Sequence, residues 1–237
     1  MSNQNNILMA SIKFGNVVVD MRGKISGNVY AKNKGGAYSR VRVKPANPKS
    51  TAQSTVRAAF TTLSQGWRAL TATQMQSWIQ GVGNFSRKNR LGDAHNLSGN
   101  SLYVSLNKNL ADVGIAAIST CPAPADVTAV AVSTAVASAG SQTLVITLTG
   151  AVPTGTSIKV FTSETVSAGV ASIGSKNRQI ASFPAAHAAA LTLTTPYLAK
   201  FGTIGAAGSK IFYKIVPVNA VTGQAGAAIS GTIVIGA

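Results

Sequence analysis

The sequence predicts an α+β protein of several parts, in which a β-ribbon arm and a small three-helix unit precede an antiparallel β-sandwich. Two changes along the 237 residues support this prediction. Apolar residues recur every three or four positions between residues 50 and 113, as on one face of a helix, and every second position after residue 127, as in strands. Charge changes at the same place, because residues 1–120 contain 15 basic and three acidic residues, whereas residues 121–237 contain six and two.

The first part, residues 1–48, is expected to be a basic β-ribbon. Short β-prone runs alternate with glycines, and the turn Asn33-Lys34-Gly35-Gly36 between two of these runs is typical of a hairpin. Strand alternation in the last run predicts that Arg40, Arg42 and Lys44 share one face, which gives the ribbon a cationic edge or face. The ribbon has too few apolar residues to form a core alone, so we expect it to lie on something else.

The second part, residues 49–118, is expected to contain an αα-hairpin and a third helix. Ser50 with Gln53, and Thr71 with Gln74, have the spacing of capping boxes. The third helix has Ser98 as its candidate N-cap. Apolar residues at helical spacing form the expected helical core, namely Val56, Phe60, Leu63, Trp67, Leu70, Met75, Trp78 and Ile79.

The last parts are a proline-rich linker, residues 119–125, and a β-rich domain, residues 126–237. About seven short period-two runs, separated by Gly, Pro and Ser clusters and without helix signals, predict the antiparallel sandwich. Charged residues make up only 11% of the chain, which is low for a free monomer. Either neighbouring copies cover much of the surface, or a Ser/Thr/Asn-rich surface keeps the chain soluble without charge.

Catalytic and metal-binding chemistry has little support in the sequence. The five acidic residues are scattered, and two histidines and one cysteine, Cys121, cannot form a zinc site by themselves. We therefore expect no enzyme activity, no metal and no cofactor. The first twenty residues lack the pattern of a secretory signal, and no apolar run is long enough to span a membrane.

A net charge of +16 indicates a negatively charged partner without identifying it. Two interpretations stay open for the basic arm: it clamps onto an acidic protein neighbour, or it binds nucleic acid by charge and by stacking on Tyr30 and Tyr38. Under either interpretation the candidate contact residues are Arg22, Lys24, Lys32, Lys34, Arg40, Arg42, Lys44, Arg87, Lys88 and Arg90.

The C-terminal half resembles a fibronectin type III or immunoglobulin-like (Ig-like) module. The stretch 213–223 is similar to the penultimate strand of that family, and residues 122–127 fit its usual start. The tryptophan that the family has in an early strand is absent, because both tryptophans, Trp67 and Trp78, lie upstream. The resemblance implies an Ig-like sandwich, and whether it binds a host ligand stays open.

The N-terminal half is similar to a group of virion-structural proteins of phages and prophages. The match is carried by the spacing of glycines, an Asn-Pro and both tryptophans, in residues 23–30, 35–43 and 45–48, then Gln53, Arg57, Phe60, Trp67, 70–71 and Trp78. This resemblance implies a head-associated, connector or tail protein located in the virion and assembled in the host cytoplasm. The implied partners are other virion proteins and copies of itself, with no membrane; the alternative is a nucleic-acid-binding protein that uses the basic arm.

Overall fold

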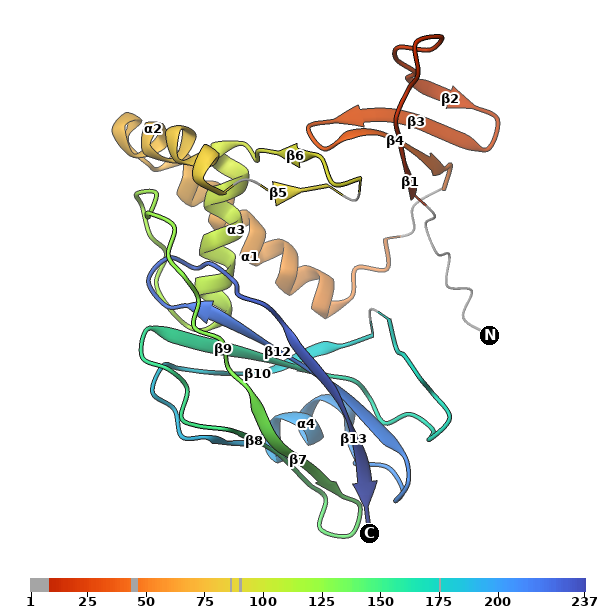
Figure 1. Ribbon diagram of the computed structural model, residues 1–237, viewed down its shortest axis with the longest axis vertical. Coiled ribbons are helices and arrows are strands. Elements are labelled where there is room, and N and C mark those ends of the chain that lie inside the picture. Colours follow the sequence, from red (N-terminus) through yellow and green to blue (C-terminus); the bar gives the residue numbers. More distant parts are fainter. Residues whose placement is uncertain (1–8, 44–46, 86, 90, 175) are drawn as a thin grey trace. The chain divides into compact units, whose positions relative to one another are not determined.

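The computed structural model describes residues 9–43, 47–85, 87–89, 91–174 and 176–237 (Figure 1). The chain divides into two units, of which the first ends at Val104 and the second begins at Ser105. Helices and a curled seven-stranded sheet make it a mixed α and β protein, consistent with the α+β class. The four-part division expected from the sequence stays a prediction.

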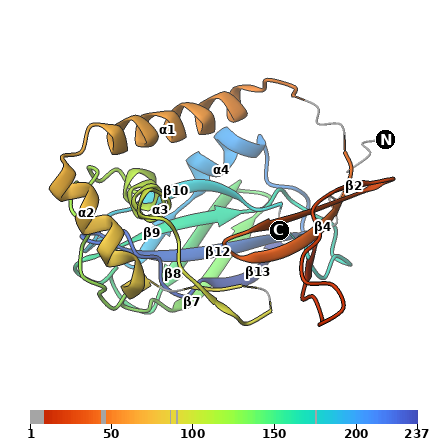
Figure 2. The same cartoon turned by 90° about the horizontal axis from the view of Figure 1, so that it is seen from above.

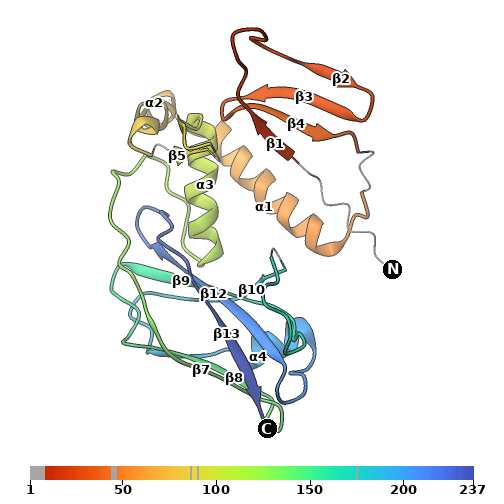
Figure 3. The same cartoon turned by 45° about the vertical axis from the view of Figure 1, so that its right-hand side comes forward.

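A four-stranded antiparallel sheet begins the first unit, with strand order β1-β4-β3-β2 (Figure 3). The predicted hairpin is confirmed, because β3 and β4 pair from Asn28 opposite Val41 to Asn33 opposite Gly36. In the turn, the side-chain oxygen of Asn33 accepts a hydrogen bond from the Gly35 N–H at 2.8 Å. Gly36 has φ of 111°, a conformation that favours glycine. The strands are β1 (Met9–Ile12), β2 (Gly23–Ile25), β3 (Asn28–Asn33) and β4 (Gly36–Val41).

The predicted helices follow, and local capping chemistry explains where they begin. Thr71 and Gln74 form a complete capping box at the start of the second helix. At the first helix, Ser50 accepts a hydrogen bond from the Gln53 N–H at 3.4 Å, but the side-chain oxygen of Gln53 has no partner among the described residues. Figure 2 shows the first two helices meeting at an angle. The elements are α1 (Thr51–Arg68), α2 (Ala72–Gly81), the 3₁₀ helix η1 (Val82–Phe85), β5 (Arg87–Lys88), β6 (Ala94–His95) and α3 (Gly99–Asp112).

The described residues between η1 and α3 form a short strand pair and a predicted helix N-cap. Arg87 and Lys88 form strand β5, which pairs with β6. The N-cap of α3 is confirmed, because the Ser98 hydroxyl accepts a hydrogen bond from the Ser101 N–H at 3.2 Å.

The prediction of the helical core is wrong for some of its residues. Leu63 and Trp78 are buried, and Trp67, Leu70 and Met75 are partly buried. However, Val56, Phe60 and Ile79 are exposed by 63%, 58% and 54%. The aromatic contacts of α1 begin at Trp67, near its C-terminal end, so the N-terminal turns keep an apolar face that no described element of the unit covers.

The second unit contains a seven-stranded sheet with order β10-β9-β12-β13-β7-β8-β11 (Figure 1). Neighbouring strands pair antiparallel, as predicted, except β13 and β7, which pair in parallel. The strands are β7 (Val132–Ser138), β8 (Thr143–Leu148), β9 (Thr156–Thr162), β10 (Arg178–Phe183), β11 (Ala190–Thr192), β12 (Lys210–Asn219) and β13 (Ile229–Gly236).

A helix that the sequence reading missed contributes to the core of this sheet. Helix α4 (Thr194–Phe201) follows β11 directly and places Tyr197 in the core with no exposed surface. The core side chains come from alternate positions of the strands, as the period-two pattern predicts. They include Leu144, Ile146, Ile158, Val160, Leu191, Ile211, Ile215, Ile233 and Ile235.

The C-terminal turns of α3, which belong to the second unit, are held by a polar cluster around Lys159 of β9. The Lys159 ammonium donates to the Asn109 side-chain oxygen at 2.8 Å and lies 3.5 Å from the Asp112 carboxylate. Asp112 also pairs with Lys108. Burial lowers the pKa of Lys159, and the charge of Asp112 opposes that shift. Gly223, with φ of 73°, brings its turn so close to α3 that an added Cβ would lie 2.4 Å from the Leu106 carbonyl oxygen.

Candidate partner-binding surface

The cationic residues of the N-terminal sheet do not share one face. Residues directly opposite each other in antiparallel strands point to the same side, so Lys24, Val29 and Arg40 form one row across the sheet. Lys32 lies opposite Ala37 and points to the other side. Positive charge therefore occurs on both sides of the sheet, and the predicted shared face of Arg40, Arg42 and Lys44 stays a prediction, because only Arg40 lies in a described strand.

The remaining basic residues of the arm lie outside the strands. Strand β4 ends at Val41, so strand alternation does not place Arg42, whose backbone N–H donates to the Gly27 carbonyl at 2.7 Å. Arg22 pairs with Asp20 at 3.0 Å, and Lys34 is exposed in the hairpin turn. The predicted contact residues Lys44 and Arg90 lie outside the described residues.

One junction brings together basic segments that are more than fifty residues apart in sequence. The Asn89 side-chain amide donates to the Gly35 carbonyl at 3.0 Å, which joins the loop after Arg87 and Lys88 to the hairpin turn that contains Lys34. Arg87 and Lys88 are both exposed. A hollow of about 380 Å³ lies beside this contact, between the turn and residues 95–101. Of the predicted contact residues, the structure thus groups Lys34 with Arg87 and Lys88.

Acidic side chains are too few in the first unit to neutralise it. Residues 1–104 contain 14 basic and two acidic residues. Both acids already have a partner, because Asp20 pairs with Arg22 and Asp93 pairs with Lys13 at 2.9 Å. Hydrogen bonds from Lys13 and Asn89 lower the pKa of Asp93. The unit therefore carries a strong excess of positive charge that attracts an acidic partner.

The exposed apolar face of α1 is the second feature of this unit. Val56 and Phe60 lie four residues apart, on the same side of the helix. Arg57 is exposed beside them, and residues 51–81 contain no acidic side chain. Two exposed apolar side chains on one helix face, one of them aromatic and with an arginine beside them, have the residue types that are enriched in protein interfaces. We call Val56, Arg57 and Phe60 the α1 stripe.

A residue that the sequence reading missed organises the helices of this unit. The ring of Tyr103 on α3 lies 5.6 Å from that of Trp67 and 5.3 Å from that of Trp78. Burial raises the pKa of Tyr103. The sequence signal for this role was the position of Tyr103 in α3: it follows the apolar Leu102, and it lies four residues after Gly99 and so on the same helix face. The two tryptophans are therefore core residues, as expected, and they meet through Tyr103.

Metal-binding side chains do not gather in the part of the chain that the structure describes. No group of three or more His, Cys, Asp or Glu side chains there could hold a metal ion. Burial raises the pKa of the Cys121 thiol, which disfavours the reactive thiolate. None of the described helices is long and apolar enough to cross a membrane.

Comparisons with known proteins found no match to the chain among family models, curated proteins or solved structures.

Proposed function

We propose that the chain is a structural component of a bacteriophage particle, as a head-associated, connector or tail protein. Its first unit would attach to the particle, and its second unit would form a neighbouring or projecting layer. The resemblance of residues 23–78 to virion-structural proteins supports this assignment. The partners would be other virion proteins and copies of the same chain, and the chain would be located in the virion.

The α1 stripe is the observation that carries the proposal. An exposed Phe60 and Val56 would contribute binding free energy through burial against a partner, at about 25 cal/mol per Å² of apolar surface removed from water. The fourteen basic residues of the unit would add attraction to acidic groups and speed up the encounter. Repetition of the contact in a symmetric particle would add avidity.

We also propose that the second unit is an Ig-like domain. Its first, second and fifth strands, β7, β8 and β11, are neighbours in the order β7-β8-β11, and the other four are neighbours in the order β10-β9-β12-β13. In an Ig-like sandwich the first, second and fifth strands belong to one sheet and the third, sixth and seventh strands to the other, as in these two groups. Here the parallel pair of β13 with β7 joins the two groups. Helix α4 would be an addition between the fifth and sixth strands.

Incorporation into particles tests the attachment. Phe60→Asp places a charge in the α1 stripe, and Thr61→Asp places the same charge one residue further along α1, at another exposed position. Gradient-purified particles should contain the wild-type chain and the Thr61→Asp variant at equal copy number, and the Phe60→Asp variant at a much lower one. A chain that is absent from purified particles, or a Phe60→Asp variant that is incorporated normally, would contradict the proposal.

Nucleic-acid binding is the second candidate function, and the grouping of Lys34, Arg87 and Lys88 favours it. Tyr30 and Tyr38 point to opposite sides of the sheet, so they do not form a shared stacking platform. The triple variant Lys34→Glu, Arg87→Glu, Lys88→Glu distinguishes the two functions. Loss of incorporation with unchanged DNA binding supports a protein partner, whereas DNA binding that weakens steeply with salt and is lost in the variant supports the second function.

A further inference from the structure

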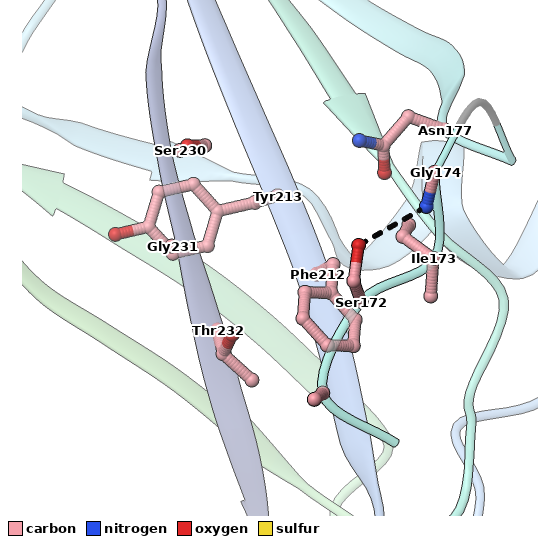
Figure 4. A pocket seen from close by; sticks show the side chains of 10 residues that line it. Ser172, Ile173, Gly174, Asn177, Phe212, Tyr213, Ser230, Gly231 and Thr232 are labelled. Carbon is pink, nitrogen blue, oxygen red and sulfur yellow. Dashed lines mark hydrogen bonds between the residues drawn. The ribbon is translucent and has the colours of Figure 1, made fainter.

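Two places in the second unit gather polar side chains, and they differ in chemistry. A hollow of about 410 Å³ lies beside β12 and β13, and Figure 4 shows Ser172 of the β9–β10 loop on one side of it and Thr232 of β13 on the other. Its described lining residues are all uncharged at neutral pH. An amine, a carboxamide and a carboxylate meet instead where Lys159 of β9 lies against Asn109 and Asp112 of α3. This second group contains the functional groups that amide formation needs.

Lys159 has the environment of a nucleophilic amine. Its side chain is 8% exposed and points to the face of β9 opposite the core side chains Ile158 and Val160. Burial lowers the pKa of Lys159, so the neutral amine, which is the nucleophilic form, is reached more readily than in water. The Asp112 carboxylate lies 3.5 Å from Lys159 Nζ, which makes Asp112 the base that can take up the lysine proton.

Asn109 places its carboxamide carbon beside the same amine. Lys159 Nζ donates to Asn109 Oδ1 at 2.8 Å, and the carbonyl bond from Oδ1 to Cγ is about 1.2 Å long, so Nζ lies within about 4 Å of Cγ. Asn109 Nδ2 donates to the Gly223 carbonyl at 2.8 Å, which fixes the plane of the amide. A primary amide is a poor electrophile, and positioning of this kind can supply an effective concentration of up to about 10⁸ M.

We propose that Lys159 and Asn109 join in an intramolecular amide bond, with Asp112 as the group that transfers the proton. Asp112 takes one proton from the Lys159 ammonium, and the electron pair of Nζ forms a bond to Asn109 Cγ. A second Nζ proton moves to Nδ2, the Cγ–Nδ2 bond breaks, and ammonia leaves with the proton that Asp112 held. One ammonium and one carboxamide thus become one secondary amide and one free ammonium ion, and the balance needs no oxidant and no co-reactant.

The bond ties α3 covalently to β9. It closes the chain between residues 109 and 159 into a loop, and a crosslink of this kind stabilises a protein mainly by restricting the unfolded chain. Lys159 no longer titrates once the bond has formed, so charge and ionisation effects at this lysine belong to the uncrosslinked chain. The reaction takes place within one unit and does not depend on attachment to a particle.

Mass spectrometry of the purified full chain tests the proposal. The intact mass should be lower than that of the unmodified sequence by one ammonia, at once or after several days at mildly alkaline pH. Trypsin locates the change, because it does not cleave after an acylated lysine and residues 110–158 contain no lysine or arginine. The crosslinked chain should give one peptide, residues 109–176, whereas the uncrosslinked chain gives two, 109–159 and 160–176. Succinimide formation at an asparagine also releases ammonia, but it leaves the cleavage at Lys159 intact.

Three variants and one control identify the reacting groups. Asn109→Ala removes the acyl group and Lys159→Met removes the amine, so neither variant should lose ammonia. Asp112→Asn keeps both reactants and removes the base, so it should lose ammonia much more slowly than the wild type. Lys214→Met is the matched control: it removes an exposed amine on β12, opposite Phe161 and on the same face as Lys159, and it should lose ammonia like the wild type.

A wild-type chain that keeps its full mass after the incubation and gives the two separate tryptic peptides would overturn the proposal. Loss of ammonia from Lys159→Met to the same extent as from the wild type would overturn it too. The wild-type measurement decides the question even where a variant fails to fold. It uses the free chain and does not involve the α1 stripe, so this proposal and the proposed function fail separately.

Discussion

The exposure of Phe60 leads to a quantitative prediction about stability. Full burial of a phenylalanine side chain stabilises a protein by about 1.5–3 kcal/mol. Phe60 is 58% exposed, so Phe60→Ala should lower the free energy of unfolding by only about 1 kcal/mol. Leu63, three residues further along the same helix, is 7% exposed, and Leu63→Ala should cost about 2–4 kcal/mol.

Urea unfolding followed by tryptophan fluorescence measures this difference. Both tryptophans, Trp67 and Trp78, lie in the first unit, so the signal reports on that unit and not on the sheet domain. Neither variant removes a fluorophore, and the slope of the transition should stay constant. If Phe60→Ala costs as much as Leu63→Ala, Phe60 is buried in the free chain and the α1 stripe is not available to a partner.

Three further predictions concern the second unit. Asp112→Asn should destabilise the second unit by about 2–4 kcal/mol, because the substitution leaves the charged, nearly buried Lys159 without its carboxylate partner. The double variant with Lys159→Met should recover most of that loss in thermal unfolding. The pKa of Lys159 is lowered in the folded state, so between the lowered pKa and its ordinary value of 10.5 the lysine is protonated in the unfolded chain and neutral in the folded one. The free energy of unfolding of the uncrosslinked wild type should therefore rise with pH across that window, relative to the Lys159→Met variant. An equal pH dependence in both proteins would contradict this prediction. Gly223→Ala should lower the free energy of unfolding by at least about 2 kcal/mol, because Gly223 has a positive φ and lies close to the Leu106 carbonyl. Gly150→Ala is the control, because Gly150 has open space around it, and it should change the melting temperature little. Equal shifts of the melting temperature in the two variants would refute the close approach of Gly223 to α3.

Local chemistry explains which parts of the fold could be predicted from the sequence. The hairpin turn at residues 33–36 and the N-caps Ser50, Thr71 and Ser98 depend on side chains that bond to their own neighbouring backbone, so their signals are local. The period-two pattern likewise predicted about seven short strands in this half of the chain, because alternation follows from strand geometry.

The remaining features depend on which residues pack against each element, and the spacing of apolar residues along the sequence does not contain that information. The helical spacing of Val56 and Phe60 is the same as that of Leu63 and Trp67, but only the second pair has neighbours that cover it. Lys159 alternates with apolar residues as a surface lysine would, yet it is buried against α3. Helix α4 was missed because its first residue, Thr194, continues a strand-like alternation from Leu191.

Photo-crosslinking from position 60 in assembled particles tests the attachment through the α1 stripe most directly. A photoreactive phenylalanine analogue at position 60 should crosslink to an acidic-surfaced protein of the particle or to a neighbouring copy of this chain, and the same analogue at position 61 should do so far less. Crosslinks from both positions at equal yield, crosslinks to packaged DNA, or only crosslinks within one chain would contradict a protein contact through Val56, Arg57 and Phe60.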